Sequence, residues 1–169
     1  MIQTLHIRNI ALIDELEISL SQGFHILTGE TGAGKSIIID AVNFVLGERA
    51  NRDLIQSGAE SAAVEASFST LSSPSVQQKL NEFGIPYEAG DELVFSRALY
   101  TNGKNVIRIN GVLVNLGTLK SISDMLVDIH GQHDHQSLLR QDEHISFLDH
   151  FGKASISEKK RQVSELYQA

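Results

Sequence analysis

The segment from Gly29 to Ser36 constrains this chain more than any other part of its sequence. It reads Gly-Glu-Thr-Gly-Ala-Gly-Lys-Ser and matches the pattern G-x-x-x-x-G-K-[ST] at every defined position. A short apolar run over 24–28 predicts a buried strand before it, and apolar residues at helical spacing over 37–46 predict a helix after it. Gly47 stands where that helix would have its C-terminal cap. We therefore expect a strand, a glycine-rich loop and a helix in direct succession.

This succession is the context in which the pattern binds nucleotide phosphates. Glycines let the backbone direct successive N–H groups at one anion, and the dipole of the following helix adds to the attraction. Lys35 supplies a positive charge for the β- and γ-phosphates, and Ser36 supplies a hydroxyl for Mg²⁺. The predicted cofactors are therefore ATP and Mg²⁺. The candidate nucleotide-binding residues are Gly29, Glu30, Thr31, Gly32, Ala33, Gly34, Lys35, Ser36 and Ile37.

The rest of the chain alternates between short apolar runs and turn residues. Asn102-Gly103 and Asn110-Gly111 are dipeptides typical of tight hairpin turns, and together they indicate antiparallel strands. The expected fold class is α/β, with a mixed sheet around the glycine-rich loop and an antiparallel meander. The expected strands lie before residue 20 and over 62–68, 93–99, 106–109, 112–114 and 125–129, and the expected helices lie over 75–83 and 116–124.

The last part of the chain predicts helices. Apolar residues favour a short helix over 141–151 and another from Ser155, in which Ile156, Val163 and Leu166 follow a coiled-coil spacing. This second helix reaches the last residue without a capping signal, so we expect the natural chain to continue. The predicted organisation is one lobe over 1–152 and the beginning of a coiled-coil helix over 153–169.

Composition excludes several classes of protein. The 169 residues include no cysteine, which excludes disulfides and thiolate metal sites. No apolar run reaches the roughly 18 residues of a membrane helix, so no membrane partner is expected. The net charge of −7 argues against a chain built wholly as a surface for polyanions. A basic cluster in the tail fits either the solvated face of a coiled coil or a DNA contact; it consists of Lys153, Lys159, Lys160 and Arg161.

A second polar segment, His130-Gly131-Gln132-His133-Asp134-His135-Gln136, follows the expected strand over 125–129. Because ligands of α/β sheets bind at the carboxyl ends of strands, Gln132 or Gln136 could reach the γ-phosphate or the water on Mg²⁺. The histidines suggest a metal site only weakly, since their spacing matches no defined ligand pattern. Asp128 is another candidate for Mg²⁺, although no second acidic residue follows it.

Two stretches together resemble the bacterial RecN family of DNA double-strand-break repair proteins, which are related to SMC proteins. They are LHIRNIALIDELEISLSQGFHILTGETGAGKSIIIDAVNFVLGERA and VDIHGQHDHQSLL. The resemblance covers essentially the whole chain but only the N-terminal part of the family's architecture. The glycine-rich loop is shared by many families, whereas the combination with GERANRDLI and HGQHDHQ is much more specific.

The resemblance implies an ABC-type ATPase head made from the two ends of a longer chain, which a long antiparallel coiled coil separates. It implies that residues 29–36 are the Walker A motif, that Lys35 and Gln132 are catalytic, and that Ser36 and Gln132 hold Mg²⁺. Gln136 is the alternative glutamine for this role. Arg49 and Arg52 fall where SMC-like heads carry an arginine near nucleotide or DNA.

The same resemblance implies partners and a location. The implied partners are DNA, the C-terminal half of the same protein, and a second head in an ATP-dependent homodimer. The implied location is the bacterial cytoplasm, in association with the nucleoid. The sequence shows neither the Ser-Gly-Gly signature motif nor an apolar run ending in Asp-Glu, both of which lie in the C-terminal part of the family's chains. The chain alone is therefore expected to bind ATP with little hydrolysis.

Two other functions stay open. A small P-loop kinase would need arginines that close over the phosphates, and Arg49, Arg52, Arg97 and Arg108 are the candidates. The antiparallel meander and the tail helix fit a kinase poorly. A nucleotide-gated interaction module, the other possibility, would use the tail helix for dimerisation.

Overall fold

The computed structural model describes two compact units, Met1–Val127 and Asp128–Ala169. In the first unit it describes residues 1–29, 34–69, 73–88 and 90–127. In the second it describes 128–129, 145, 148–149, 151–152, 156, 159, 161, 163 and 166–167. The predicted division between residues 152 and 153 stays a prediction.

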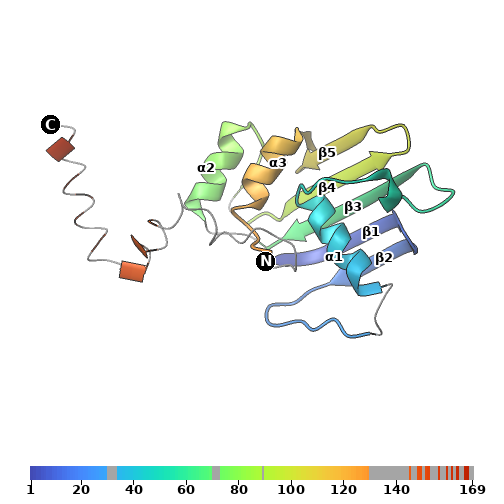
Figure 1. Ribbon diagram of the computed structural model, residues 1–169. Helices are drawn as coiled ribbons and strands as arrows, with labels where there is room; N and C mark the ends of the chain where they lie inside the picture. Colours follow the sequence, from blue (N-terminus) through green and yellow to red (C-terminus); the bar gives the residue numbers. More distant parts are fainter. Residues whose placement is uncertain are drawn as a thin grey trace. The chain divides into compact units, whose positions relative to one another are not determined.

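The first unit is built on a six-stranded sheet with the order β2-β1-β3-β4-β5-β6 (Figure 1). Every neighbouring pair in this order is antiparallel. The predicted α/β fold class and the antiparallel meander are therefore confirmed. The strands are β1 (Ile2–Ile10), β2 (Ile13–Ser19), β3 (Ser61–Phe68), β4 (Leu93–Tyr100), β5 (Asn105–Ile109) and β6 (Val112–Leu113).

The two Asn-Gly dipeptides form the turns that the sequence predicted. Asn110 and Gly111 have φ values of 46° and 79°, and both positive values suit the tight turn between β5 and β6. Gly103, with φ 86°, lies in the turn between β4 and β5. The turn between β4 and β5 sets the register that places Phe95 opposite Ile109, and the turn between β5 and β6 places Ile109 opposite Val112.

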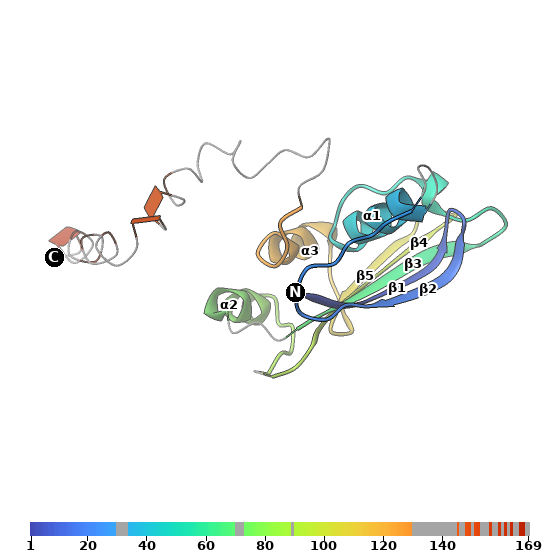
Figure 2. The ribbon, with the colours of Figure 1, turned by 90° about the horizontal axis from the view of Figure 1, so that it is seen from below.

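The helix α1 (Gly34–Val45) lies across one face of the sheet (Figure 2). Its buried residues Ala41, Phe44 and Val45 contribute to the core between helix and sheet. Alternate strand residues complete this core, as expected for a sheet with one covered face. One row of successive cross-strand partners runs through five strands and consists of Leu16, Ile7, Val64, Arg97 and Ile107.

Three shorter helical elements connect or cover the strands. The predicted helices over 75–83 and 116–124 are confirmed as α2 (Pro74–Glu82) and α3 (Leu116–Ser123), and η1 (Arg52–Leu54) is a short 3-10 turn. Helix α3 begins where the Oδ1 atom of Asn115 accepts a hydrogen bond of 2.8 Å from the backbone N–H of Thr118. This side-chain cap satisfies a backbone donor that the first turn of a helix cannot pair internally.

Two predicted strands are not strands in the described structure. Residues 24–28 have no regular secondary structure and belong to the connection between β2 and α1, and the side chains of Phe24 and Ile26 are 88% and 71% exposed. Residues 124–126 instead continue the end of α3 as a turn, in which Leu126 N–H donates to the Ser123 carbonyl. A strand needs a neighbouring strand for its backbone hydrogen bonds, and among the described residues neither segment has one. The parallel part of the predicted mixed sheet is therefore absent from the described strands.

The described residues of the second unit from Ile145 onward have helical backbone, in agreement with the predicted tail helices. Their apolar side chains are open to solvent, for example Phe151 at 89% and Leu166 at 80% exposure. No helix in the described part of the chain has the length and apolar character needed to cross a membrane.

Candidate functional site

The first turn of α1 carries the second half of the glycine-rich segment. The helix begins at Gly34, so Lys35 and Ser36 lie at its N-terminus, where backbone N–H groups have no partners within the helix. The Nζ atom of Lys35 donates a hydrogen bond to the carbonyl oxygen of Gly29, so the ammonium group lies against the start of the loop. Residues 30–33, which include Glu30, Thr31, Gly32 and Ala33, lie outside the described residues.

The described residues at this end of α1 fit an anionic ligand. The first turn contains no acidic residue that would repel phosphate, and the positive end of the helix dipole lies there. Ser36 is exposed at the helix start, so its hydroxyl is accessible to a cation such as Mg²⁺. These residues could hold a nucleotide phosphate and its metal ion.

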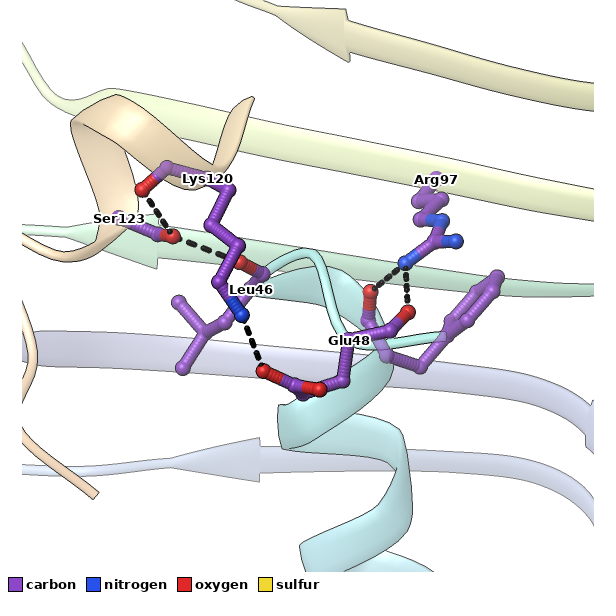
Figure 3. Close-up of polar contacts among 6 residues, drawn as sticks. Leu46, Glu48, Arg97, Lys120 and Ser123 are labelled. Atoms are coloured by element: carbon purple, nitrogen blue, oxygen red, sulfur yellow. Dashed lines mark hydrogen bonds and ion pairs between the residues drawn. The ribbon is translucent and has the colours of Figure 1, made fainter. Parts of the chain in front are cut away.

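The opposite end of α1 is held by a buried arginine. The Nη1 atom of Arg97 in β4 donates hydrogen bonds to the carbonyl oxygens of Phe44 at 2.5 Å and Glu48 at 2.8 Å. Its guanidinium carbon lies 4.3 Å from the centroid of the Phe44 ring. In Figure 3 the guanidinium group points from the sheet toward the chain that leaves the helix. The Phe44 carbonyl oxygen also accepts from the Gly47 N–H at 3.2 Å, so Arg97 gives it a second donor and gives one to Glu48, three residues after the helix.

Helix α3 reaches the same end of α1 from another side (Figure 3). The hydroxyl of Ser123, which is buried, donates to the carbonyl oxygen of Leu46 at 2.6 Å. The ammonium group of Lys120 forms an exposed ion pair of 2.5 Å with Glu48. Gly47 has φ 107° and ends the helix as the sequence predicted. The C-terminal end of α1 is thus fixed by both a strand and a helix.

The environment of Arg97 affects its proton affinity. Burial away from water lowers the pKa of the Arg97 guanidinium below its ordinary value, to about 10, and the negative charge of Glu48 opposes this shift. The guanidinium group therefore remains protonated at neutral pH. A charged group in this position can donate stronger hydrogen bonds than a neutral one.

The other arginine candidates have different surroundings. Arg97 is 1% exposed, which contradicts its candidacy as an arginine that closes over the phosphates in the kinase alternative. Arg52 lies against the turn between β4 and β5, so close that a Cβ added at Gly103 would be 2.9 Å from the Nη2 atom of Arg52. Arg49 and Arg108 are exposed. Sequence reasoning missed the role of Arg97, although its alternation with Leu93, Phe95 and Leu99 indicated the buried face of a strand.

The remaining candidate residues are mostly outside the described part of the chain. Gln132, Gln136 and the histidines of the polar segment belong to this undescribed part. Asp128 is described and exposed, but it follows no strand, which removes the premise of its predicted role in Mg²⁺ binding. The described residues contain no group of three or more His, Cys, Asp and Glu side chains placed to hold a metal ion.

Comparison with known proteins places this site in a family. The sequence model of the AAA domain matches residues 4–169. The chain is 42% identical over 168 residues to the DNA repair protein RecN of Halalkalibacterium halodurans, and 41% identical over 169 residues to that of Bacillus subtilis. Each alignment covers 99% of this chain and 29% of the relative, so the chain spans about three tenths of the length of these relatives.

Solved structures agree with the sequence comparison. A chain from work on ATP-driven dimerization and DNA-stimulated activation of SMC ATPases has a TM-score of 0.59 and 26% identity, with 98% of both chains covered. The Smc head domain of Pyrococcus furiosus with an extended coiled coil has a TM-score of 0.64 and 25% identity, over 99% of this chain and 46% of that chain. The resemblance predicted from the sequence is thus confirmed. The chain belongs to the AAA domain family, and within it is similar to the N-terminal portion of the bacterial RecN DNA repair proteins.

Proposed function

We propose that this chain is the ATP-binding N-terminal lobe of an ATPase head in a RecN-like DNA repair protein. The observation that carries the proposal is the position of Lys35 and Ser36 in the first turn of α1, with the Lys35 ammonium against Gly29. Membership in the AAA domain family supports nucleotide binding. In this proposal Gly29 to Ile37 surround the phosphates of ATP, and the bound nucleotide supplies the phosphoanhydride bond that is hydrolysed.

Each proposed role follows from the chemistry of the side chain. Lys35 is a point charge that neutralises phosphate oxygens, and loss of this charge weakens ATP binding. The Ser36 hydroxyl, together with Gln132, is proposed to hold Mg²⁺, which would offset the remaining phosphate charge. Gln136 remains the alternative to Gln132.

The proposal also requires a second part of the protein. Phe24, Ile26 and Leu27 lie just before the glycine-rich segment, and their side chains are exposed in the first unit. Such an apolar stretch is suited to form a strand once a neighbouring strand covers it. We propose that the C-terminal half of the same protein supplies this strand, together with the signature and Walker B motifs. The chain alone then binds ATP but hydrolyses it slowly.

ATP-dependent pairing of two such heads is the proposed consequence of nucleotide binding. The likeness to a chain from work on ATP-driven dimerization of SMC ATPases supports this step. DNA is the proposed partner of the assembled protein, because the matched relatives are named DNA repair proteins. The proposed place of action is the bacterial cytoplasm, at the nucleoid.

The test measures steady-state ATP turnover of the full-length protein with and without linear duplex DNA, beside the variant Lys35→Ala. We expect turnover to rise with DNA and to vanish in Lys35→Ala. The matched control is Lys104→Ala, which removes an exposed lysine in the turn between β4 and β5. A separate titration of ATP into the 169-residue chain should give a dissociation constant that rises about 10- to 100-fold in Lys35→Ala, since a charge-assisted hydrogen bond contributes roughly 1.5–3 kcal/mol.

The alternatives give different results in the same experiments. Turnover that is indifferent to DNA would contradict the repair function while leaving nucleotide binding intact. Transfer of phosphate to a small acceptor would support a kinase instead. Equal ATP affinity of the wild-type chain and Lys35→Ala would contradict the proposed binding site itself.

A further inference from the structure

Arg97 occupies a position in the sheet where its neighbours are apolar. The residues beside it in the same cross-strand row are Val64 in β3 and Ile107 in β5. Only 1% of the surface of Arg97 is exposed. A buried charge at such a site requires partners, because its transfer from water is unfavourable without them.

The backbone partners of Arg97 lie at the C-terminal end of α1, and its side-chain partner lies in β5. Arg97 Nη1 donates to the Phe44 and Glu48 carbonyl oxygens, and Arg97 Nε donates to Asn105 Oδ1 at 3.2 Å. The guanidinium group also lies over the Phe44 ring. One side chain thus connects β4, β5 and the end of α1.

An apolar side chain of similar size would fill the same space in the core. Replacement of a buried ionic group by a well-packed apolar one is often neutral for stability or even stabilising. It would, however, remove the donor that Arg97 gives to the Glu48 carbonyl oxygen and leave the Phe44 carbonyl oxygen with the longer bond from the Gly47 N–H. Filling the core therefore does not require an arginine here, whereas the bonds that fix the end of the helix do.

We infer that Arg97 is a positioning residue for nucleotide binding. It fixes the C-terminal end of α1 and thereby the position of Lys35 and Ser36 at the other end of the helix. This inference rests on the proposed function, in which the first turn of α1 binds phosphate. A helix of the 12 residues of α1 is about 18 Å long, so a tilt of about 5° at one end moves the other by roughly 1.5 Å. A displacement of this size is enough to impair the geometry of phosphate contacts.

The test compares ATP affinity and thermal unfolding in the 169-residue chain. The variants are Arg97→Met, which keeps the length but removes the donors, and Arg97→Lys, which keeps the charge but not the forked geometry. Arg108→Met is the matched control, because Arg108 is an exposed arginine of the adjacent strand. Ser123→Ala is a milder variant that removes the bond to the Leu46 carbonyl and leaves Arg97 in place. All affinities are measured well below the unfolding temperature of each variant, with hydrogen exchange of the α1 amides as an independent readout.

We expect the ATP dissociation constant to rise about tenfold or more in Arg97→Met, with partial rescue in Arg97→Lys and no change in Arg108→Met. Amides of α1 should exchange faster in Arg97→Met than in the control. If Arg97→Met does not fold, a several-fold loss of affinity in Arg97→Lys and Ser123→Ala carries the same conclusion, and unchanged affinity in both overturns it.

A merely structural role has a different signature. A lower unfolding temperature with unchanged ATP affinity in folded Arg97→Met would overturn the inference and leave the proposed function standing. Failure of the proposed function is recognised separately, because the wild-type chain would then bind ATP no better than Lys35→Ala. That result would overturn both the proposed function and the inference.

Discussion

If the C-terminal half docks on residues 24–28 as proposed, replacement of Ile26 by alanine should weaken its association with this chain without destabilising the chain itself. The side chain of Ile26 is 71% exposed, so most of its apolar surface is still available for burial by a partner. Full burial of such a side chain contributes roughly 1.5–3 kcal/mol, and the exposed share of it corresponds to about 1–2 kcal/mol. The dissociation constant for the two parts should therefore rise roughly 5- to 30-fold.

The assay titrates the C-terminal part into the 169-residue chain by isothermal calorimetry, and thermal unfolding of the chain alone is followed by circular dichroism. Leu113→Ala is the matched control, because Leu113 is 65% exposed but lies in β6, far from residue 26 in the sequence. This control should change neither measurement. An unchanged dissociation constant in Ile26→Ala would refute the proposal that residues 24–28 form a strand beside the C-terminal half. A fall of several degrees in the unfolding temperature would refute the premise that the side chain is exposed in the isolated chain.

Two further predictions concern the end of α1. Gly47→Ala should lower the free energy of unfolding by about 1–2 kcal/mol and the unfolding temperature by about 2–8 °C. The expected cause is backbone strain, because φ is 107° at Gly47, whereas an added Cβ would lie 3.4 Å from its nearest atom, which is an ordinary contact. Gly58→Ala, with φ 89° and no atom within 4 Å of an added Cβ, should show a similar loss in calorimetry if strain is the cause, and no loss would favour crowding at Gly47. The difference in unfolding temperature between wild type and Arg97→Met should stay constant from about pH 6 to 9. Burial lowers the pKa of Arg97 to about 10, so the folded and unfolded states both hold its proton between about pH 6 and 9. Only above about pH 10 does the unfolded state bind more protons than the folded state, and there the contribution of Arg97 to the free energy of unfolding rises with pH. A clear pH dependence of the difference near neutrality would contradict this.

The hairpins and the helix after the glycine-rich loop were predictable because their signals are local. Asn110-Gly111 supplies two residues that accept positive φ, which determines the turn almost independently of the rest of the chain. Asn115 likewise marks the start of α3 with its own side chain. In β4 buried residues alternate with half-buried ones, which is the period of two expected of a strand.

The two wrong strand predictions concern segments whose secondary structure depends on hydrogen-bond partners elsewhere in the protein. The apolar run over 24–28 has the composition of a buried strand, but composition does not reveal whether a neighbouring strand is present in the same chain. The run over 125–129 is also apolar, yet Met125 and Leu126 donate to carbonyl groups at the end of α3 and continue its last turn. In both cases the hydrogen-bond partners, which sequence periodicity does not specify, decided the structure.

Arg97 shows how a site residue can be misjudged from sequence. An arginine in a chain with a phosphate-binding motif invites a role in contact with the ligand, but the place of Arg97 in the alternation of β4 assigns it to the covered face of the sheet. At that face it meets the negative end of the α1 dipole, whereas the positive end is free to attract phosphate. The exposed pair Lys120–Glu48 lies at the same helix end, but an exposed ion pair contributes little to stability. The bonds of Arg97 and Ser123 therefore fix the C-terminal end of α1, in addition to the packing of its buried apolar side chains against the sheet. The helix dipole favours a cation at this end and an anion at the other.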